Sequence, residues 1–576
     1  MTLATLFTAL TILVTTAQKP ASGTVRPDGV YFADFGKDAY GQLEISYRAG
    51  GKDSVVVRFG ERLAGDMAID RNPPGTVRFA EYRLSPGSGD MTCRIRFRPD
   101  PRNGRIDGNP DPQGQPPVLM DPAIGEVLPF RYVEVEGAEV LSLTRHMVHV
   151  PFNDAASSFV SSDSTLNAVW DLCKHTMKAT TFCGVYVDGD RERIPYEADA
   201  LINALGHYGT DADYRVARRT MEVLLEHPNW PTEWHLQMPL LAWDYYMYSG
   251  DLTALQKNYD KLVERALLRF RDSTGLITTT GQKAIRDIVD WPRVWSKNPL
   301  GADDHYALTK YNTVVNAFHA ASLRTLAKIA RAIGKEDDAV RFSRLADETA
   351  KVLNALFFDP ATGTYLDGSD TDHRALHATM FPLALGLVPE ENVKDALRFI
   401  EGKGMVCSVY GAHFLLEGLY EYGDAGYALS LMTSHGECSW YNMIREGATM
   451  TMEAWGQKYK PNQDWNHAWG AAPASAIPHR LMGVRPLEPG GTLVEFRPQP
   501  GGLEFAEALV PMKPGGVKCS FRRGGNGKYT YSITVPEGMR ARIVLPGRKP
   551  VEKAAGTYIF RGKGNDSICY RKRLMR

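Results

Sequence analysis

The spacing of apolar residues changes twice along this 576-residue chain, and this constrains its fold more than any other feature. From about residue 24 to 155, apolar and polar residues alternate, as in 42–48, which predicts an all-β domain of the sandwich type. From 160 to 483 apolar residues recur every three or four positions, which predicts helices. After Gly483 alternation returns, which predicts a smaller β-sandwich over 484–576.

The helical region has room for roughly a dozen helices of ordinary length. Helical hairpins in that number close into an (α/α)6 barrel or stack into a solenoid, and periodicity does not separate these two folds. In either fold, loops at one end gather residues that are far apart in the sequence.

Residues 1–17 are apolar and end in Thr15-Thr16-Ala17, a small-x-small site that predicts a signal peptide. The alternative is an uncleaved membrane anchor, and no later apolar run is long enough to span a bilayer. We therefore expect an exported protein, periplasmic or extracellular.

Lysine plus arginine and aspartate plus glutamate each number 67, so charge gives no reason to expect nucleic acid or an acidic membrane surface as a partner. The seven cysteines lack zinc-site spacing, and only Cys519 and Cys569 are predicted to form a disulfide. Phosphate-loop, zinc-peptidase and serine-hydrolase motifs are missing from the sequence. No cofactor is expected, and calcium binding stays open.

Charged residues are densest in the segment 187–199, which holds five carboxylates, two arginines and a tyrosine before an apolar helix that Pro195 is expected to begin. Such a run is either a solvated turn or a site where neighbouring charges shift proton affinities. Segments 445–455 and 464–470 again mix acids, histidine and tryptophan. Two such islands predict two halves of one pocket.

All ten tryptophans lie between residues 170 and 469. Tryptophans interleaved with acids are typical of a sugar-binding cleft, and the alternative is that they fill a large helical core. Helical spacing assigns Trp170 to the core. Trp291, Trp455 and Trp465 each stand beside an acid or the Asn466-His467 pair, which favours the site.

Three further groups are candidates for the same cleft. Asp290-Trp291 forms either a sugar-contacting loop or a helix start with Asp290 as its cap. Glu233-Trp234-His235 lines the mouth of the pocket or caps a helix. Glu446 is a rival to Glu453 as a catalytic base, because it lies seven residues earlier in the same island.

Taken with the predicted domain order, the segments 188–199 and 447–455 resemble glycoside hydrolase family 78, the inverting α-L-rhamnosidases. The segments 32–36 and 130–137 resemble the β-domain that precedes the barrel in that family, and Asn466-His467 with Gly470 resembles its later substrate-binding stretch. The resemblance implies a central (α/α)6 barrel between two β-sandwiches. It also implies that an oligosaccharide or polysaccharide is the substrate.

The same resemblance implies roles for individual residues. It places the general acid on Glu192 and the base on Glu453. The chain is two residues shorter than the family between its first aspartate and Glu192, so Asp190 is an alternative to Asp188. The residues expected to contact the sugar are Asp188, Arg193, Tyr196, Asp199, Trp234, Asp290, Trp291, Trp455 and His467.

Inverting hydrolysis needs one protonated and one ionised carboxyl, about 6.5 to 9.5 Å apart. We expect the acids around Glu192 to raise its pKa by like-charge repulsion. For that to hold, Arg191 or Arg193 has to point away or pair with Glu197.

Two other classes of protein fit parts of this pattern. A non-catalytic carbohydrate-binding protein needs the tryptophans but not the paired acids. A glycosidase or lyase acting on a uronate needs a cation, which Arg191 or Arg193 could supply, and a lyase also needs a base such as Tyr196.

Overall fold

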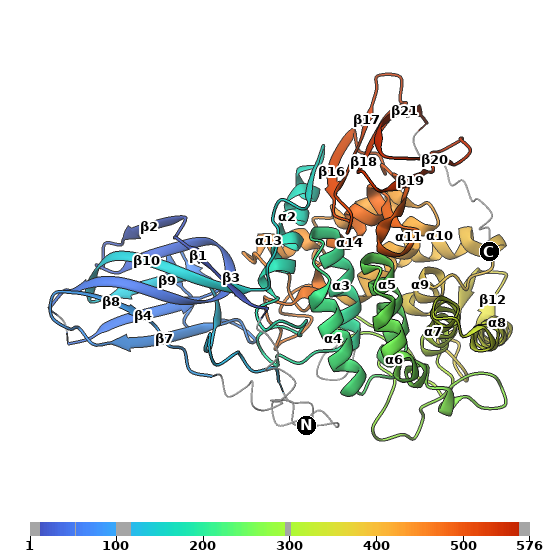
Figure 1. Ribbon diagram of the computed structural model, residues 1–576. Coiled ribbons are helices and arrows are strands. Elements are labelled where there is room, and N and C mark those ends of the chain that lie inside the picture. Colours follow the sequence, from blue (N-terminus) through green and yellow to red (C-terminus); the bar gives the residue numbers. More distant parts are fainter. Residues whose placement is uncertain (1–11, 52, 100–116, 294–300, 564–576) are drawn as a thin grey trace.

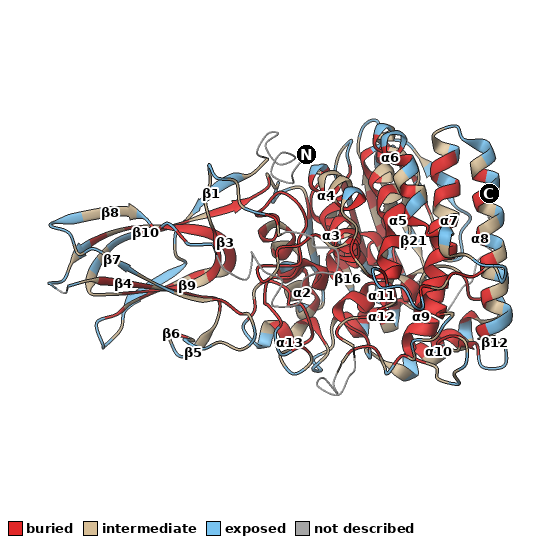
Figure 2. Cartoon of the chain, turned by 90° about the horizontal axis from the view of Figure 1, so that it is seen from below, coloured by how far each residue is buried: buried red, intermediate tan, exposed pale blue. Residues whose placement is uncertain are grey.

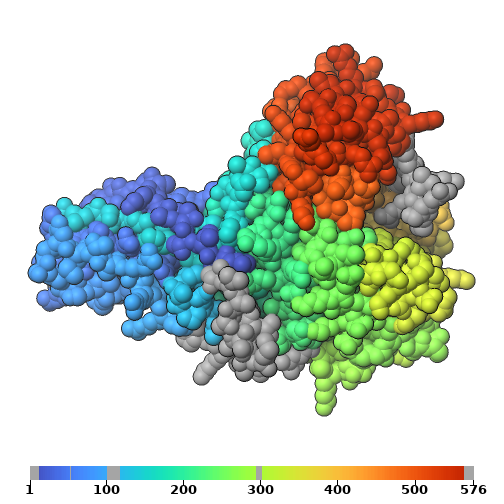
Figure 3. Space-filling model, viewed as in Figure 1, coloured from blue at the N-terminus to red at the C-terminus, as the bar shows by residue number. Residues whose placement is uncertain are grey.

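The structure is a computed structural model that describes residues 12–51, 53–99, 117–293 and 301–563. The N-terminal strands project to one side of a helical part, and the C-terminal strands lie above the helices (Figure 1). In the space-filling view these two parts form separate lobes, blue and orange-red (Figure 3). Among the described residues, no helix is both long enough and apolar enough to cross a membrane.

The N-terminal part is one hydrogen-bonded sheet in the order β1-β10-β3-β9-β4-β7. The long strand β3 changes partners along its length, because its first residues pair with β2 and β9 and its last with β8 and β10. A core that includes Phe59, Phe130 and Val133 lies against this sheet. The strands are β1 Val14–Gln18, β2 Ser22–Val25, β3 Tyr31–Ala49, β4 Val55–Gly60, β5 Leu63–Gly65, β6 Ala68–Ile69, β7 Phe79–Leu84, β8 Asp90–Arg94, β9 Leu128–Glu136 and β10 Ala138–His149.

Strand β1 bears on the predicted leader. Its residues Val14 to Ala17 fall within the predicted signal peptide, yet they pair with β10 in register from Val14 opposite His149. Residues 1–11 lie outside the described residues, so the leader itself stays a prediction.

Six helices form a closed ring in the helical part: α3 contacts α5, followed in turn by α7, α9, α11 and α14, which returns to α3. The intervening helices pack outside them, and the outer helix α8 keeps an exposed face (Figure 2). The helices are α2 Ser164–Ala179, α3 Glu197–Thr210, α4 Arg215–Glu226, α5 Thr232–Ser249, α6 Leu252–Arg265, α7 Thr313–Ala332, α8 Glu336–Phe357, α9 Leu376–Ala384, α10 Val393–Lys403, α11 Val409–Glu421, α12 Ala425–Met432, α13 Trp440–Arg445 and α14 Pro473–Ala476.

Helix α7 shows why the sequence forms such a ring. Asn312 caps it by accepting from the backbone N–H groups of Val314 and Val315, and apolar residues recur at helical spacing behind the cap. Because α7 contacts α5, α8 and α9, most of its surface is buried.

The C-terminal part has two sheets, in the orders β11-β16-β17-β18-β21 and β14-β15-β19-β20. Strand β11 comes from the segment that joins the N-terminal part to the helices, so this linker is built into the C-terminal part. Cys519 lies on β17, whereas Cys569 lies outside the described residues, so their disulfide stays a prediction. The strands are β11 Ser158–Ser161, β14 Val484–Pro486, β15 Leu493–Phe496, β16 Phe505–Val510, β17 Val517–Arg523, β18 Tyr529–Val535, β19 Arg540–Ile543, β20 Val551–Lys553 and β21 Gly556–Gly562.

Candidate active site

The first acidic island is a tight loop in front of α3. The backbone N–H of Asp188 donates to the carbonyl of Ile194 (3.0 Å), and the N–H of Ile194 donates to Asp188 Oδ1 (2.9 Å). Helix α3 begins at Glu197 with Tyr196 as its N-cap, so the prediction that Pro195 lies in its first turn was wrong. The loop leaves Glu192 at its edge with a 17% exposed side chain, while Asp188 is buried.

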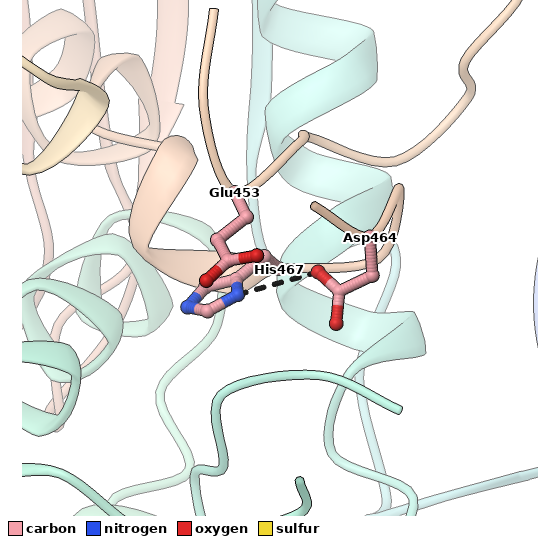
Figure 4. A group of neighbouring side chains, drawn as sticks. All are labelled: Glu453, Asp464 and His467. Carbon is pink, nitrogen blue, oxygen red and sulfur yellow. Dashed lines mark ion pairs between the residues drawn. The ribbon is translucent and has the colours of Figure 1, made fainter. Parts of the chain in front are cut away.

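The two halves of the second island run side by side. The N–H of Glu453 donates to the carbonyl of Asp464 (3.2 Å), and the N–H of His467 donates to the carbonyl of Thr451 (2.9 Å). These bonds bring Glu453, Asp464 and His467 into one cluster (Figure 4). The rival base Glu446 is exposed at the end of α13 and lies outside this cluster.

Arg191 joins the two islands. Its Nη1 pairs with Glu192 Oε1, and its Nη2 lies 3.2 Å from Glu453 Oε1. Lys460 Nζ lies 2.6 Å from the same Glu453 oxygen. Glu453 Oε2 has no hydrogen-bond partner within the part of the chain that the structure describes. Two carboxylates from distant segments therefore meet on one guanidinium group, and one of them keeps an oxygen for a further ligand.

His467 lies between two buried carboxylates. Its Nε2 is 2.9 Å from Asp199 Oδ1, in the first turn of α3, and its Nδ1 is 3.4 Å from Asp464 Oδ1. Burial lowers the pKa of His467, but the two carboxylates outweigh burial and raise it well above its usual value. The raised pKa favours the imidazolium form, whose Nε2 donates to Asp199 Oδ1, whereas Nδ1 has no hydrogen-bond partner among the described residues.

Burial and neighbouring charges shift the pKa values of the carboxyl groups of Glu453, Asp188 and Glu192. Burial raises the pKa of Glu453, yet Lys460, Arg191 and His467 together lower it to about 2, so this group is ionised. Burial and the Glu192 charge raise the pKa of Asp188 well above its usual value. For Glu192 itself, the effect of burial is exceeded by Arg191 and by a hydrogen bond from Asp188, and its pKa is lowered.

The expected rise in the pKa of Glu192 was therefore wrong for the free protein. Arg193 does turn away, to Glu126 and Asp190, but Arg191 binds both Glu192 and Glu453 and lowers the pKa of Glu192. Of these two neighbouring carboxyls, Asp188 holds a proton more tightly than Glu192 does, because burial raises the pKa of Asp188 while Arg191 lowers that of Glu192. Arg191 is thus engaged by both glutamates in the free protein.

Aromatic side chains line the site at the first turns of the inner helices. The Tyr196 hydroxyl donates to Glu192 Oε2 (3.0 Å), and its ring meets Trp234 edge-on at 5.6 Å. Trp234 packs against Tyr410, and Tyr410 stacks on Trp469 at 5.8 Å. Trp469 lies 4.9 Å from the ring of His467, so an aromatic wall connects the two islands.

Three of the predicted sugar contacts have other partners. Arg193 is buried and pairs with Glu126 (2.6 Å) and Asp190 (2.8 Å), so it ties the loop down and does not face the cluster. Trp455 is buried, meets Trp440 edge-on at 5.0 Å and donates from Nε1 to the carbonyl of Cys407 (2.7 Å), so it is a core residue.

The third is Asp290. Its Oδ2 lies 2.7 Å from His377 Nε2 and accepts from the N–H of Ser408 (2.9 Å), and its Oδ1 accepts from the N–H of Trp291 (2.8 Å). These bonds connect the loop that contains Asp290 to the starts of α9 and α11, so Asp290 stabilises the contact between these three segments. Trp291 beside it is half-buried, and its sugar contact stays a prediction.

Sequence reasoning missed Lys460, and it placed Asp464 in the second island without giving it a role; both lie within the cluster. Lys460 stands in an ordinary polar loop, and no motif marks it. Ligand atoms of Glu453, Asp464 and His467 lie within 4.8 Å of one another, close enough to hold a cation. Such a cation would have to displace Lys460 from Glu453, and Arg191 and the His467 imidazolium would repel it.

Two hollows on the surface lie away from this cluster. One, of about 970 Å³, is lined by residues such as Phe152, Tyr214 and Lys513, and the other, of about 470 Å³, by residues such as Lys37 and Trp170. Neither is lined by Glu192 or Glu453.

Gly189 lets the loop approach the second island. Its φ is +95°, and an added Cβ would lie 2.6 Å from Asp464 Oδ2 and 2.9 Å from Asn466 Oδ1. Gly447 has a similar φ of +99° but nothing within 4 Å of its Cβ position. The glycine at 189 is therefore needed for both its backbone conformation and its missing side chain.

We expect Gly189→Ala to lower the free energy of unfolding by more than Gly447→Ala, in urea titrations of both variants. Gly447→Ala carries only the backbone penalty, roughly 1–2 kcal/mol. Gly189→Ala adds a collision with two buried side chains, so we expect at least about 1 kcal/mol more. Equal destabilisation of the two variants would show that the loop does not rest against Asp464.

The ring of helices and the acidic cluster lie within a segment that matches a family model, and that model describes the class of six-hairpin glycosidase domains. The chain belongs to the bacterial alpha-L-rhamnosidase family: residues 154–481 match the model of its six-hairpin glycosidase domain, and residues 483–560 match that of its C-terminal domain.

Individual relatives agree with this family. An alpha-L-rhamnosidase of Alteromonas sp. (strain LOR) is 23% identical over 562 residues, which cover 88% of this chain and 58% of the relative. The fold is similar to the alpha-L-rhamnosidase from Dictyoglumus thermophilum (TM-score 0.75, 18% identity, 95% of this chain and 63% of that one). It is also similar to the Streptomyces avermitilis alpha-L-rhamnosidase complexed with L-rhamnose (TM-score 0.70, 19% identity, covering 96% of this chain and 53% of that one). The chain thus spans between half and two thirds of the length of these relatives.

Proposed function

We propose that this chain removes terminal α-L-rhamnose from glycans or glycosides by single-displacement inversion. The observation that carries the proposal is the meeting of Glu192 and Glu453, 261 residues apart in sequence, on the guanidinium of Arg191. Family membership supports rhamnose as the sugar, since the matched relatives are named for that activity.

Glu453 is the base in this proposal. It is ionised, and its Oε2 is without a hydrogen-bond partner among the described residues, so it can hold a water. As that water attacks the anomeric carbon, Glu453 takes one of its protons, and the bond from the anomeric carbon to the leaving oxygen breaks. The sugar leaves with inverted configuration.

Glu192 is the acid, and it gives a proton to the leaving oxygen. Asp188 of the Asp188–Glu192 pair supplies that proton, because burial raises its pKa well above the usual value. Glu192 is the partly exposed member of the pair, so transfer from Asp188 to Glu192 brings the proton to the edge where a leaving group can lie. Tyr196, which donates to Glu192 Oε2, orients the carboxyl.

The proposal also covers the arrangement of the domains and the export of the protein from the cell. The ring of inner helices is consistent with the predicted (α/α)6 barrel, and the sheet that folds around β3 is consistent with the predicted N-terminal sandwich. We further propose export by a leader within residues 1–17, and an oligosaccharide or polysaccharide substrate.

The direct test is proton NMR of the purified protein with an aryl α-L-rhamnoside. The expected first product is β-L-rhamnose, which then mutarotates. Initial α-L-rhamnose would contradict inversion, and no release of sugar would contradict rhamnosides as the substrate class.

Lys460 provides a test of the base. Because its ammonium lowers the pKa of Glu453, Lys460→Met is expected to raise that pKa from about 2. An opposite charge in contact typically shifts a carboxyl pKa by roughly 1 to 3 units. The acid limb of the kcat/KM profile, below which Glu453 is protonated, should therefore move to higher pH by a similar amount.

The matched control is Lys458→Met in the same loop, since Lys458 pairs with the exposed Glu437. Its profile should follow that of the wild type. An acid limb that stays in place in Lys460→Met would mean that a group other than Glu453 titrates there.

A further inference from the structure

Asn466 is a fully buried amide at which three distant segments meet. Its Oδ1 accepts from the backbone N–H of Asp190 (2.9 Å) and from the hydroxyl of Tyr40 (2.7 Å), and its Nδ2 donates to Glu61 Oε1 (2.9 Å). The Asp190 N–H can only donate, so this bond fixes which end of the amide is oxygen. All three side-chain bonds cross between segments more than 250 residues apart in sequence.

Two of these partners belong to the N-terminal sheet. Tyr40 lies on β3, and its ring stacks on Phe182 at 3.6 Å with an interplanar angle of 9°. Glu61 directly follows β4 and accepts from the backbone N–H of Arg78 (2.5 Å). Burial and the neighbouring Asp38 raise the pKa of Glu61 well above its usual value. At this end of the network the Tyr40 hydroxyl and the Glu61 carboxylate are both buried and hydrogen-bonded to Asn466.

The third partner is the loop that carries the proposed acid. Asp190 stands two residues before Glu192, its carboxylate pairs with Arg78 and Arg193, and its N–H is the point where Asn466 holds the backbone. On the other side, Asn466 is followed directly by His467, which contacts Asp199. The same amide thus connects the N-terminal sheet to both islands of the site.

We propose that Asn466 is a positioning residue, which fixes the loop 188–193 to the N-terminal sheet so that Glu192 stays aligned with Glu453. Asn466 touches neither glutamate through any bond that the structure describes, so its effect is on geometry. The N-terminal sheet contributes no member of the acid and base pair, yet it sets their separation. The kinetic part of this inference rests on the proposed hydrolase function.

The first test needs no activity. Hydrogen–deuterium exchange measured by mass spectrometry on Asn466→Ala is expected to show loss of protection in peptides that cover residues 188–196. The matched control is Asn167→Ala, whose amide makes three hydrogen bonds to Ser161 at the junction with the C-terminal sheets. Unchanged exchange at 188–196 in Asn466→Ala, or an equal change in Asn167→Ala, would overturn the inference.

Tyr40→Phe covers the case in which Asn466→Ala does not fold. This variant removes only the hydroxyl that donates to Asn466 and keeps the ring that stacks on Phe182. We expect a smaller loss of protection in the same peptides. Protection equal to that of the wild type in this variant would contradict the proposed coupling.

The second test is kinetic and uses aryl α-L-rhamnosides. A displacement of about 1 Å at a catalytic group costs roughly 100-fold in rate, so kcat of Asn466→Ala should fall by about that factor, with KM much less affected. The double variant Tyr40→Phe/Asn466→Ala should be no slower than Asn466→Ala, because both changes remove the same connection. Multiplicative losses in kcat, or a loss confined to KM, would overturn the positioning role.

The two tests separate two kinds of failure. If the wild type releases no rhamnose, the proposed function fails, and the exchange experiment still decides whether Asn466 holds the loop. If the wild type is active and exchange at 188–196 is unchanged in both variants, the function stands and the positioning role fails.

Discussion

Glu453→Gln is expected to lower kcat on aryl α-L-rhamnosides by roughly 10²- to 10⁴-fold, the range typical of a lost general base. The amide cannot accept a proton from water. It also leaves Lys460 and Arg191 buried with one carboxylate fewer, so the site becomes more positive. Steady-state kinetics at several pH values measure the loss, which should persist across the pH range because no titrating base remains.

The chain offers a close control for this variant. Glu446→Gln alters a glutamate of the same island that is exposed, and it should keep wild-type kinetics. Added azide should partly restore turnover of Glu453→Gln, because a small anion can attack without a base, and the product should be the β-configured azide. Equal losses in Glu446→Gln, or an α-configured azide, would contradict the assignment of Glu453.

The sequence predicted the order of the domains because each has its own apolar period. Strand β3 alternates as expected, with Leu43, Ile45 and Tyr47 buried in the core. Strand β11 could not be foreseen, because its partner β16 lies about 350 residues further along the chain. Local periodicity carries no information on pairing over such distances.

Site residues could be predicted where several acidic and aromatic residues stand close together in the sequence. They could not be predicted where their role depends on the direction in which a side chain points. Tyr196 contacts Glu192 and Asp199 contacts His467, because the cap and first turn of α3 place these residues beside the loop. Trp455 is only two residues from Glu453, yet its ring faces the core, because the irregular segment between them does not set a direction. Lys460 could not be predicted as a site residue, because its contact with Glu453 is made by the fold of the loop and no sequence motif marks it.

The direction of a pKa shift also depends on geometry. Counting charges in the island suggested repulsion at Glu192, because five acids stand there with two arginines. The fold instead sends Arg193 to Glu126 and Arg191 to both glutamates. At distances of hydrogen-bonded contact the single charge of Arg191 outweighs the more distant acids.

Glu192→Gln is expected to show a loss that depends on the leaving group, which is the signature of a missing general acid. For aglycones that leave as alkoxides, kcat should fall by up to roughly 10⁴-fold, because the glutamine amide cannot protonate the departing oxygen. For a dinitrophenyl rhamnoside the phenolate leaves without a proton, so the loss should be small. The basic limb of the pH profile, which reports deprotonation of the Asp188–Glu192 pair, should also disappear.

Tyr196→Phe is the graded control, since it keeps the carboxyl and removes only the hydroxyl that donates to Glu192 Oε2. Its losses should be smaller and should follow the same order of leaving groups. A uniform loss across all leaving groups in Glu192→Gln would instead assign this residue to sugar binding. The acid would then have to be Asp188, because burial raises its pKa, and the distance from Asp188 to Glu453 would have to suit inversion.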